Sequence, residues 1–489
     1  MSSKKAALIK NTIVIALGKM STQFISLLLL PLYTAHLAAG EYGTVDLVVV
    51  IVALIAPIIM LSLEMAVFRF LIDGRGSKTQ QSTVITNSLQ MVLVSTMLIA
   101  FVYSIVMQFV AIPYGWLALA AVVASISSNY CLQVARGFGD NVKYALGSLV
   151  AGVTTVVLNI LCIVIFQMGA TGMLLATVMG NVLCALYLAY ALRLYRYIDW
   201  SLTSKSKKKE LLSYSLPLIP NNVSWWVVNA ADRMIITAFL GVAANGIYAV
   251  AYKFPQMFVA LYSFFALSWT ESAAMHIRSK DRDAFFSQVA NMSLRVFGSL
   301  GVILIAGAPL FFSIMVDETY HDAKRYVPLL LIGSLFSAIV GTYSAIYVAK
   351  KETKQVLYTS LSAAIISVGL SVVLIPLIRL YSPAVALIAA HITVAIFRHR
   401  DIKKSINITY DYTTIGGVTL LYAVAITLYY LDSVYAVVAN IIVTGVGVVI
   451  INRHTLRTLQ QTLFRKMKGL KQKQADKLAQ AWEADHGAE

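Results

Sequence analysis

The sequence contains few charged residues for its length. Charged residues make up 12% of its 489 residues, hydrophobic residues make up 59%, and the mean hydropathy is +0.77. A soluble domain carries about twice that share of charge. A chain of this composition could not cover its surface in water, so we expect a protein that spans a membrane many times.

Motifs for metals, nucleotides and catalysis are also missing. The three cysteines, Cys131, Cys162 and Cys184, are far apart in apolar runs, and no CxxC or Cys/His cluster occurs. No GxxxxGK[ST] motif marks an ATP site. The longest loop expected on the outer side, 316–325, is too short to hold the acidic site of a membrane glycosyltransferase. We therefore expect no metal, no cofactor and no covalent catalysis.

Long apolar stretches dominate the chain. A transmembrane helix needs about 20 mostly apolar residues, and about fourteen stretches meet this requirement. They lie near 11–37, 42–70, 84–112, 114–136, 144–167, 170–192, 211–240, 245–272, 286–315, 326–349, 355–379, 382–397, 413–431 and 434–451. The fold class is therefore an all-α polytopic membrane protein.

The positive charges lie mostly on one side of these spans. The chain has 39 Lys and Arg against 22 Asp and Glu, a net charge of +17. With a cytoplasmic N-terminus, only Lys324, Arg325 and Arg379 fall in outer loops. This asymmetry is the positive-inside rule, so we expect both termini in the cytoplasm. The positive charge then reflects topology and does not indicate nucleic-acid binding.

Two parts of the chain resemble each other. Residues 136–159, a polar turn followed by an apolar helix, return in similar form as 348–371. A second pair, 41–46 and 244–249, shares a central glycine. Each copy holds six predicted spans, which return the chain to its starting side, so the copies must be parallel repeats. Duplicated membrane bundles usually transport a substrate.

A polar, basic stretch separates the two copies and divides the chain into domains. The expected parts are an N-terminal six-helix bundle (1–198), a basic cytoplasmic linker (199–210), a second six-helix bundle (211–400), two extra helices (401–452) and a basic cytoplasmic tail (453–489). Leucines fall on one face of the tail, which suits a helix lying on an anionic leaflet. A freely solvated tail fits the sequence equally well.

Five cations lie within predicted spans, where a charge costs roughly 2.5–3.5 kcal/mol on insertion scales. They are Lys19, Arg69, Arg233, Lys253 and Arg295. At 1.5 Å per residue, Lys19 and Arg295 lie about 13 Å from the inner helix ends, and Arg233 and Lys253 about 11 Å from the outer ends. A water-filled cavity between the bundles would let these four meet phosphate groups. Arg69 alternatively extends to the interface.

Four acids also lie within the spans, and three of them have two interpretations. Asp232 either neutralises Lys253 or takes part in ion coupling. Glu64 and Glu271 form a cytoplasmic gate or face water, and Asp46 lies near the outer end of its span.

Prolines and tryptophans mark the seventh span. Pro217 and Pro220 predict a bend with polar groups facing the cavity. Trp225 and Trp226 would stack on sugar rings, or would pack against protein or lipid.

Residues 215–253 carry a family resemblance. Ser215-Leu-Pro217, Pro220, Asp232-Arg233 and Gly246-Ile-Tyr248 through Lys253 resemble the signature of the Wzx-type polysaccharide flippases of the multidrug/oligosaccharidyl-lipid/polysaccharide superfamily. Residues 42–46 and 64–70 resemble its first-half counterpart, and the likeness extends over about 8–400. The resemblance implies two six-helix bundles in a V with a central cationic cavity. It also implies transfer of undecaprenyl-pyrophosphate-linked oligosaccharide from the inner to the outer leaflet of the bacterial cytoplasmic membrane by alternating access.

The expected function is therefore that of a flippase and not of an enzyme. The substrate contacts would be Lys19, Arg233, Lys253, Arg295 and Trp225, and the coupling or gating residues would be Asp46, Glu64, Arg69, Asp232 and Glu271. The expected partners are the lipid-linked oligosaccharide, membrane lipids and other polysaccharide-assembly proteins, with no nucleic acid. A cation-coupled drug antiporter of the same superfamily and a non-transporting scaffold of a glycan assembly complex are the alternatives.

Overall fold

The computed structural model describes residues 27–453, and no β-strand occurs within that range. In chain order the helices are α2 (Leu30–His36), α3 (Ala39–Ile59), α4 (Leu63–Asp73), α5 (Lys78–Phe109), α6 (Gly115–Phe138), α7 (Asn141–Asn159), the π-helix η1 (Ile160–Ile165), α8 (Gly169–Ala191), the 3-10 helices η2 (Leu194–Arg196) and η3 (Trp200–Leu202), α9 (Lys205–Ser215), α10 (Leu218–Leu240), α11 (Val242–Ala251), α12 (Lys253–His276), α13 (Arg282–Met315), the 3-10 helix η4 (Glu318–Tyr326), α14 (Val327–Lys350), α15 (Thr353–Ile378), α16 (Tyr381–Lys403), α17 (Tyr412–Tyr430) and a last helix, Val434–Arg453. The predicted all-α fold is confirmed.

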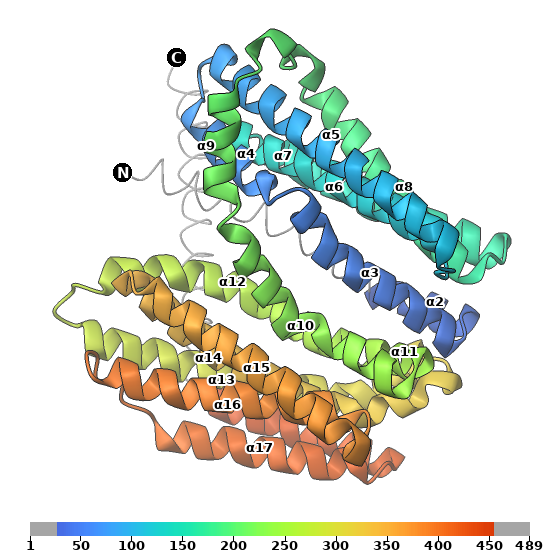
Figure 1. Cartoon of the computed structure of the whole chain (residues 1–489). Coiled ribbons are helices and arrows are strands. Elements are labelled where there is room, and N and C mark those ends of the chain that lie inside the picture. Colours follow the sequence, from blue (N-terminus) through green and yellow to red (C-terminus); the bar gives the residue numbers. More distant parts are fainter. Residues whose placement is uncertain (1–26, 454–489) are drawn as a thin grey trace, which may run out of the picture. The chain divides into compact units, whose positions relative to one another are not determined.

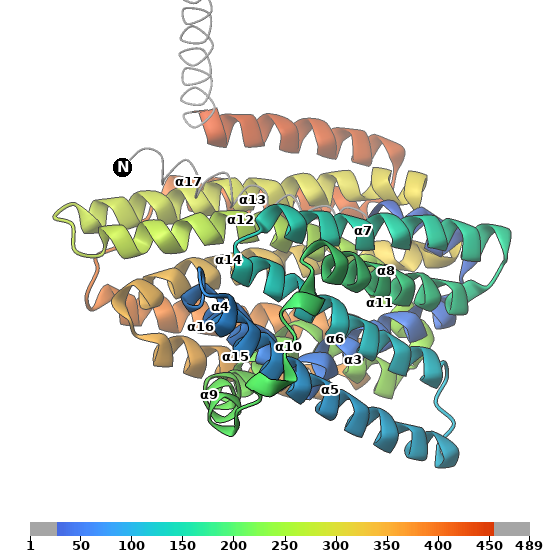
Figure 2. The same ribbon diagram turned by 90° about the horizontal axis from the view of Figure 1, so that it is seen from above.

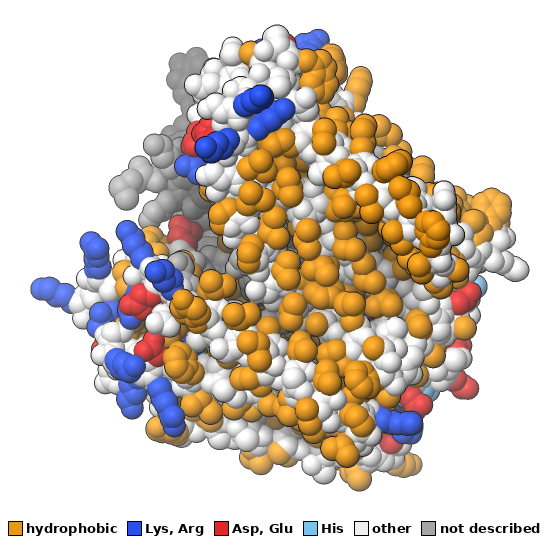
Figure 3. All heavy atoms as spheres, viewed as in Figure 1, with side chains coloured by type: hydrophobic (Ala, Val, Ile, Leu, Met, Phe, Trp, Pro, Cys, Tyr) orange, Lys and Arg blue, Asp and Glu red, His pale blue; other side chains and the backbone are white. Residues whose placement is uncertain are grey.

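Many of these helices are suited to a bilayer. Eleven described helices are long and apolar enough to cross a membrane, or 12 if α11 and α12, which meet at a 44° bend, form one span. Of the other predicted spans, the first lies mostly outside the described residues. The seventh corresponds to α10, which carries Asp232 and Arg233 and is not among the eleven. Apolar side chains cover the flank over α5 and α8, as a lipid-facing surface requires (Figure 3).

By contacts between residues, the chain falls into two compact units. Unit 1 comprises the chain up to Arg282 together with Ala308–Ile406, and unit 2 comprises Asp283–Gly307 and the chain from Asn407 onward. The long helix α13 therefore begins in unit 2 and ends in unit 1. The predicted boundaries of the two six-helix bundles differ from these units and stay a prediction.

Unit 1 contains a first group of helices, α4 to α8, with a continuous apolar core. Helices α6, α7 and α8 lie side by side, with α4 against α6 (Figure 1, Figure 2). Leu71, Val134 and Leu188 are fully buried in this core. Lipid offers little hydrophobic driving force for association of helices, so this close packing is what holds the group together.

The second predicted span is broken rather than continuous. Helix α3 ends at Ile59, and Leu61 and Ser62 take positive φ angles of 54° and 50° before α4 begins. Polar side chains of α10 lie at this region: the Asn222 Nδ2 donates to Ser62 Oγ (3.1 Å), and the Trp226 Nε1 donates to the Val50 carbonyl (2.8 Å). Irregular backbone within a membrane protein is tolerated where such protein groups surround it.

A buried arginine connects three helices of a second helix group in unit 1, which comprises α10, α12, α14, α15 and α16. Arg398 of α16 is 1% exposed. Its guanidinium donates to the Thr359 hydroxyl of α15 (3.0 Å from Nε), to the Val340 carbonyl of α14 (2.8 Å) and to the Ser344 hydroxyl. The twelfth span was predicted to end at residue 397, which placed Arg398 among the loop cations. That placement was wrong, because α16 continues to Lys403.

Unit 2 is held together by an extended segment that follows one face of α13. The backbone N–H groups of Asn407, Thr409 and Asp411 donate to the side chains of Asp283, Ser287 and Asn291, respectively, at 2.9–3.1 Å. Four helical residues rise about 6 Å and two extended residues span about 6.6 Å. Alternate residues of the segment therefore meet every fourth residue of the helix.

Candidate functional site

Helices α3 and α11 approach each other unusually closely within unit 1. A Cβ atom on Gly43 would lie 2.0 Å from the Val242 carbonyl oxygen, and one on Gly246 would lie 1.9 Å from the Ala39 carbonyl oxygen. Only glycine permits this backbone contact. Gly43 and Gly246 are the equivalent glycines of the repeated segments 41–46 and 244–249, so the repeat brings matching positions of its two copies together.

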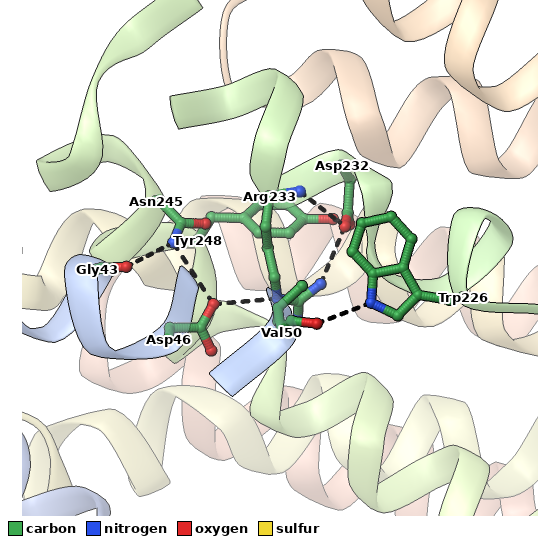
Figure 4. Close-up of polar contacts among 8 residues, drawn as sticks. All are labelled: Gly43, Asp46, Val50, Trp226, Asp232, Arg233, Asn245 and Tyr248. Atoms are coloured by element: carbon green, nitrogen blue, oxygen red, sulfur yellow. Dashed lines mark hydrogen bonds and ion pairs between the residues drawn. The ribbon is translucent and has the colours of Figure 1, made fainter. Parts of the chain in front are cut away.

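A polar cluster lies beside this contact. The Asn245 Nδ2 donates to the Gly43 carbonyl (2.9 Å), and the Arg233 Nε donates to Asp46 Oδ2 (3.1 Å) (Figure 4). The Arg233 Nη1 donates to Asp232 Oδ1 (2.9 Å), and the Tyr248 hydroxyl donates to Asp232 Oδ2. Three helices, α3, α10 and α11, thus contribute charged or polar groups to one connected network.

Arg233 is the centre of this network and is buried. Its side chain is 3% exposed, against 16% for Asp46 and 20% for Asp232. The guanidinium carbon also lies 4.2 Å from the centre of the Tyr252 ring. A guanidinium suits this place because it offers several donors in one plane and stacks on an aromatic face.

The charges of the cluster balance. Lys253, the first residue of α12, is half-buried and has Asp46 and Arg233 as charged neighbours. The two acids, Asp46 and Asp232, therefore face two cations. In this conformation Arg233 is engaged by carboxylates and does not offer its charge to a ligand.

A small pocket adjoins the cluster. Asp232 and Tyr252 line it together with Ser367 and Ser371 of α15, and apolar residues of α10 and α16 complete it. About 10 Å³ is open to the centre of a water molecule, which is close to the minimum that one water needs. The pocket could hold a water or a small cation and is far too small for a sugar. No group of three or more metal-ligating side chains occurs within residues 27–453.

The loop 316–325 contacts α2 and α3 in unit 1 through a few buried residues. The loop 316–325, the longest one expected on the outer side, forms η4. Tyr320 is fully buried, its hydroxyl donates to the Leu37 carbonyl (2.8 Å), and its ring meets the Tyr42 ring edge-on. The Asp317 N–H donates to the Thr34 hydroxyl (3.3 Å). These contacts were not predicted, because nothing in a short polar loop identifies the one residue that packs inward.

Three other predicted residues, two on α4 and one on α12, are not members of the cluster. Glu64 lies in the first turn of α4, and its Oε2 is buried without a hydrogen-bond partner among the described residues. Arg69 forms an exposed ion pair with Asp73, and Glu271 is exposed on α12. Their predicted coupling or gating roles stay predictions.

Arg295 belongs to unit 2. Its Nη2 lies 3.7 Å from Asp411 Oδ2 and 3.3 Å from the Thr414 hydroxyl. Asp411 begins α17, where hydrogen bonds from Thr413 and Thr414 lower its pKa to about 2, so it is ionised at neutral pH. Two further predicted contacts cannot be placed: Lys19 lies outside the described residues, and Trp225 belongs to α10 but its side chain lies outside what the structure describes.

Three members of the cluster, Asn245, Tyr248 and Tyr252, were not predicted as site residues. Asn245 and Tyr248 lie in the repeated segment 244–249, but their roles depend on which helix faces them. Tyr252 supplies the ring on which Arg233 stacks. Repetition of the segment around Gly246 was the one available signal for them.

Comparison of the sequence with family models gives one match. The model described as polysaccharide biosynthesis protein matches residues 8–269, more than half of the chain. A comparison with curated proteins finds no match.

Solved structures share the fold. An inward-facing multidrug resistance MATE family transporter of the MOP superfamily is similar at a TM-score of 0.67 and 16% identity, covering 80% of this chain and 98% of that one. An outward-facing structure of such a transporter gives 0.57 at 15% identity, covering 81% and 96%. The lipid II flippase MurJ in an inward closed conformation gives 0.64 at 14% identity, covering 92% and 99%. At such identities the likeness concerns the fold.

Proposed function

Because this chain belongs to the polysaccharide biosynthesis protein family, we propose that it is a flippase for a lipid-linked oligosaccharide. The substrate would be an undecaprenyl-pyrophosphate-linked oligosaccharide, carried from the inner to the outer leaflet of the bacterial cytoplasmic membrane without covalent chemistry. The observation that carries the proposal is the family match over 8–269, together with a fold like those of the MATE transporters and the lipid II flippase.

The mechanism would be alternating access, with the α3–α11 contact as the outer closure. In the predicted topology, Asp46, Arg233 and Tyr320 lie toward the outer side. The glycine contact, the ion pairs and the buried Tyr320 would together seal that side in this conformation. The higher TM-score with the inward-facing transporter than with the outward-facing one, 0.67 against 0.57, agrees with such a state.

The cations would act in two stages. While the outer side is closed, Arg233 is neutralised by Asp46 and Asp232. Separation of α3 from α11 would remove Asp46 from Arg233 and leave the guanidinium open to a pyrophosphate. Lys19, Lys253, Arg295 and Trp225 are the further proposed contacts with the substrate. This exchange of a carboxylate for a phosphate partner would cost little, because both are oxyanions that arginine binds well.

Ion coupling would act on the same carboxylates. A proton or cation that enters the small pocket reaches Asp232. Neutralising Asp232 would weaken its ion pair with Arg233 and favour opening. Glu64, buried at the helix break, is a second proposed group for this role, with Arg69 and Glu271 proposed for gating at the inner ends.

A cation-coupled drug antiporter is the second candidate, favoured by the likeness to MATE transporters. The two functions differ in what the open cluster must hold. A cationic drug requires a carboxylate that is not paired with a cation, whereas a pyrophosphate requires a cationic side chain that is not paired with a carboxylate. The excess of 39 Lys and Arg over 22 acids is a property of the whole chain and does not decide this point.

A pair of neutralising variants tests the proposal in the native host. Arg233→Gln together with Lys253→Gln should abolish surface polysaccharide and leave lipid-linked oligosaccharide on the inner leaflet, with normal amounts of inserted protein. Arg233→Lys keeps the charge and should retain partial function. Arg325→Gln, at an exposed ion pair with Asp322, is the matched control and should have no effect.

Three results would contradict this proposal. Unchanged surface polysaccharide in the double variant would remove the cluster from transport. Loss of resistance to cationic drugs with normal polysaccharide would favour the antiporter. Failure of the unaltered protein to flip purified lipid-linked oligosaccharide in vesicles would favour a scaffolding role in the cell.

A further inference from the structure

The basic linker between the two repeats is fixed to the first helix group of unit 1. Two buried side chains of α5 hold it: the Asp199 N–H donates to the Thr86 hydroxyl (3.0 Å), and the Ser204 N–H donates to Asn87 Oδ1 (2.8 Å). The Asn87 Nδ2 donates in turn to the Leu202 carbonyl (2.9 Å). Hydrogen bonds to α5 therefore hold the linker in a defined position on the first helix group.

Helix α9 continues this surface. It packs against α4 and α5, and its residues Leu211 and Ser215 are fully buried (Figure 1). Lys205 and Lys209 lie away from the face of Leu211 and are exposed, and Lys208 is half-exposed. None of these three lysines forms an ion pair with a described residue. Figure 3 shows Lys and Arg side chains gathered at this end of the group.

Exposed aromatic side chains precede these lysines in the chain. Tyr190 near the end of α8 is 82% exposed, Tyr195 is 64% exposed, and Trp200 in η3 is 57% exposed. The apolar span ends at Ala191, so Tyr190 lies in its last turn, and Tyr195 and Trp200 follow the point at which the chain leaves the hydrocarbon. Tyr and Trp are enriched at this level of membrane proteins, where one end of the ring is apolar and the other is hydrated.

We propose that these residues form an anionic-lipid site, here called the linker surface: Tyr190, Tyr195, Trp200, Lys205, Lys208 and Lys209. The rings would lie among the headgroups, and the three unpaired lysines would bind the phosphates of anionic lipids in the same leaflet. A lysine close to such a leaflet strengthens binding by roughly fivefold. Because Thr86 and Asn87 fix the linker to α5, bound lipid would anchor the first helix group while the second group moves.

Exposed rings favour lipid over a soluble anion as the ligand. A soluble phosphate would use the lysines alone and leave Tyr195 and Trp200 in water. A lipid headgroup satisfies both, since its phosphate meets the lysines while the upper acyl chain meets the rings. The proposal depends on the membrane-spanning fold and not on which substrate is transported.

Full-length protein in nanodiscs tests this site. The native cysteines are buried, so an environment-sensitive dye on Ser201→Cys reports on the linker surface. We expect the emission to shift as the phosphatidylglycerol fraction rises in phosphatidylcholine discs. The change Lys205→Gln/Lys208→Gln/Lys209→Gln should weaken this response at least tenfold, and Trp200→Ala should reduce it.

Matched lysines provide the control. Lys351→Gln/Lys354→Gln/Lys403→Gln removes the same charge at the ends of α14, α15 and α16 and should leave the response unchanged. A response that is insensitive to phosphatidylglycerol, or equal for both triple variants, would overturn the proposal. Displacement of the response by inorganic pyrophosphate at micromolar concentration would also overturn it, in favour of a soluble anion as the ligand.

Discussion

Arg233 illustrates how a cation is retained inside a membrane protein. A charge at the bilayer centre is costly, and Arg233 is almost fully buried. The cost is offset because two carboxylates and an aromatic ring surround one planar group. A lysine could not make the same contacts from a single nitrogen. The identity of residue 233 therefore matters beyond its charge.

The coupling between Arg233 and its partners is measurable. Asp46→Asn leaves an excess of buried positive charge and should lower the stability to unfolding by about 3–5 kcal/mol, the usual effect of breaking a buried ion pair. Asp46→Asn combined with Arg233→Gln should cost clearly less than the sum of the two single changes. Thermal unfolding of the detergent-purified variants gives the comparison.

The control for this cycle is the exposed pair of Asp322 and Arg325, whose side chains are 63% and 67% exposed. Asp322→Asn should shift stability by less than about 0.5 kcal/mol. Strictly additive effects at Asp46 and Arg233 would show that the two residues do not interact in the folded protein.

Individual charges were predictable from the sequence, whereas their partners were not. Polarity within an apolar stretch identifies Asp46, Asp232 and Arg233 directly. Which of them pair depends on the rotation of α3 against α10, which no local pattern records. Arg398 was missed for a different reason: a buried arginine near a helix end looks like an ordinary loop charge. Only the acceptors on α14 and α15 reveal its role.

Close contact between α3 and α11 follows from two glycines at equivalent places. The repeated segments were visible in the sequence, and their likeness indicated a duplication. That the two copies touch at their matching glycines required the structure, because a repeat does not state how its copies face each other. The positive φ angles of Leu61 and Ser62 at the break after α3 had no signal in the sequence, since neither residue is glycine.

Gly246→Ala tests the α3–α11 contact. The added methyl group would lie 1.9 Å from the Ala39 carbonyl oxygen, so the helices must separate. We expect a loss of about 1–3 kcal/mol in stability, as for other overpacked sites, together with a weaker outer closure. Unfolding midpoints measure the first effect, and labelling of Thr34→Cys by an impermeant thiol reagent measures the second.

Gly369→Ala is the matched control on α15. No atom lies within 4 Å of a Cβ at this position. Alanine favours a helix over glycine by up to about 1 kcal/mol, so this variant should be neutral or more stable. Equal effects at Gly246 and Gly369 would mean that backbone contact between α3 and α11 does not matter.

For the chain as a whole, composition and charge placement predicted the class and the approximate number of spans. Both depend on sums over many residues, which makes them robust to local error. The grouping of helices into units was less accessible. Residues Asp283–Gly307 of α13 belong to unit 2 together with α17 and the last helix, although the repeat pattern places α13 among the spans of the second copy.

The predicted topology has a direct test. A reporter that is active only in the cytoplasm should give full signal when fused after Glu489. The same reporter inserted within 318–322 should be silent. The opposite pair of signals would reverse the orientation, and signal at both places would imply an even number of spans between them.

The hydrogen bonds between α13 and residues 407–411 also bear on how chains with different numbers of spans are related. In a descendant that lost everything after residue 406, Ser287 and Asn291 would remain on a membrane helix without the backbone groups that they now hydrogen-bond. Such a loss would be tolerated only after those side chains had become apolar. Shorter relatives should therefore have aliphatic residues in α13 at the positions where this chain has Asp283, Ser287 and Asn291.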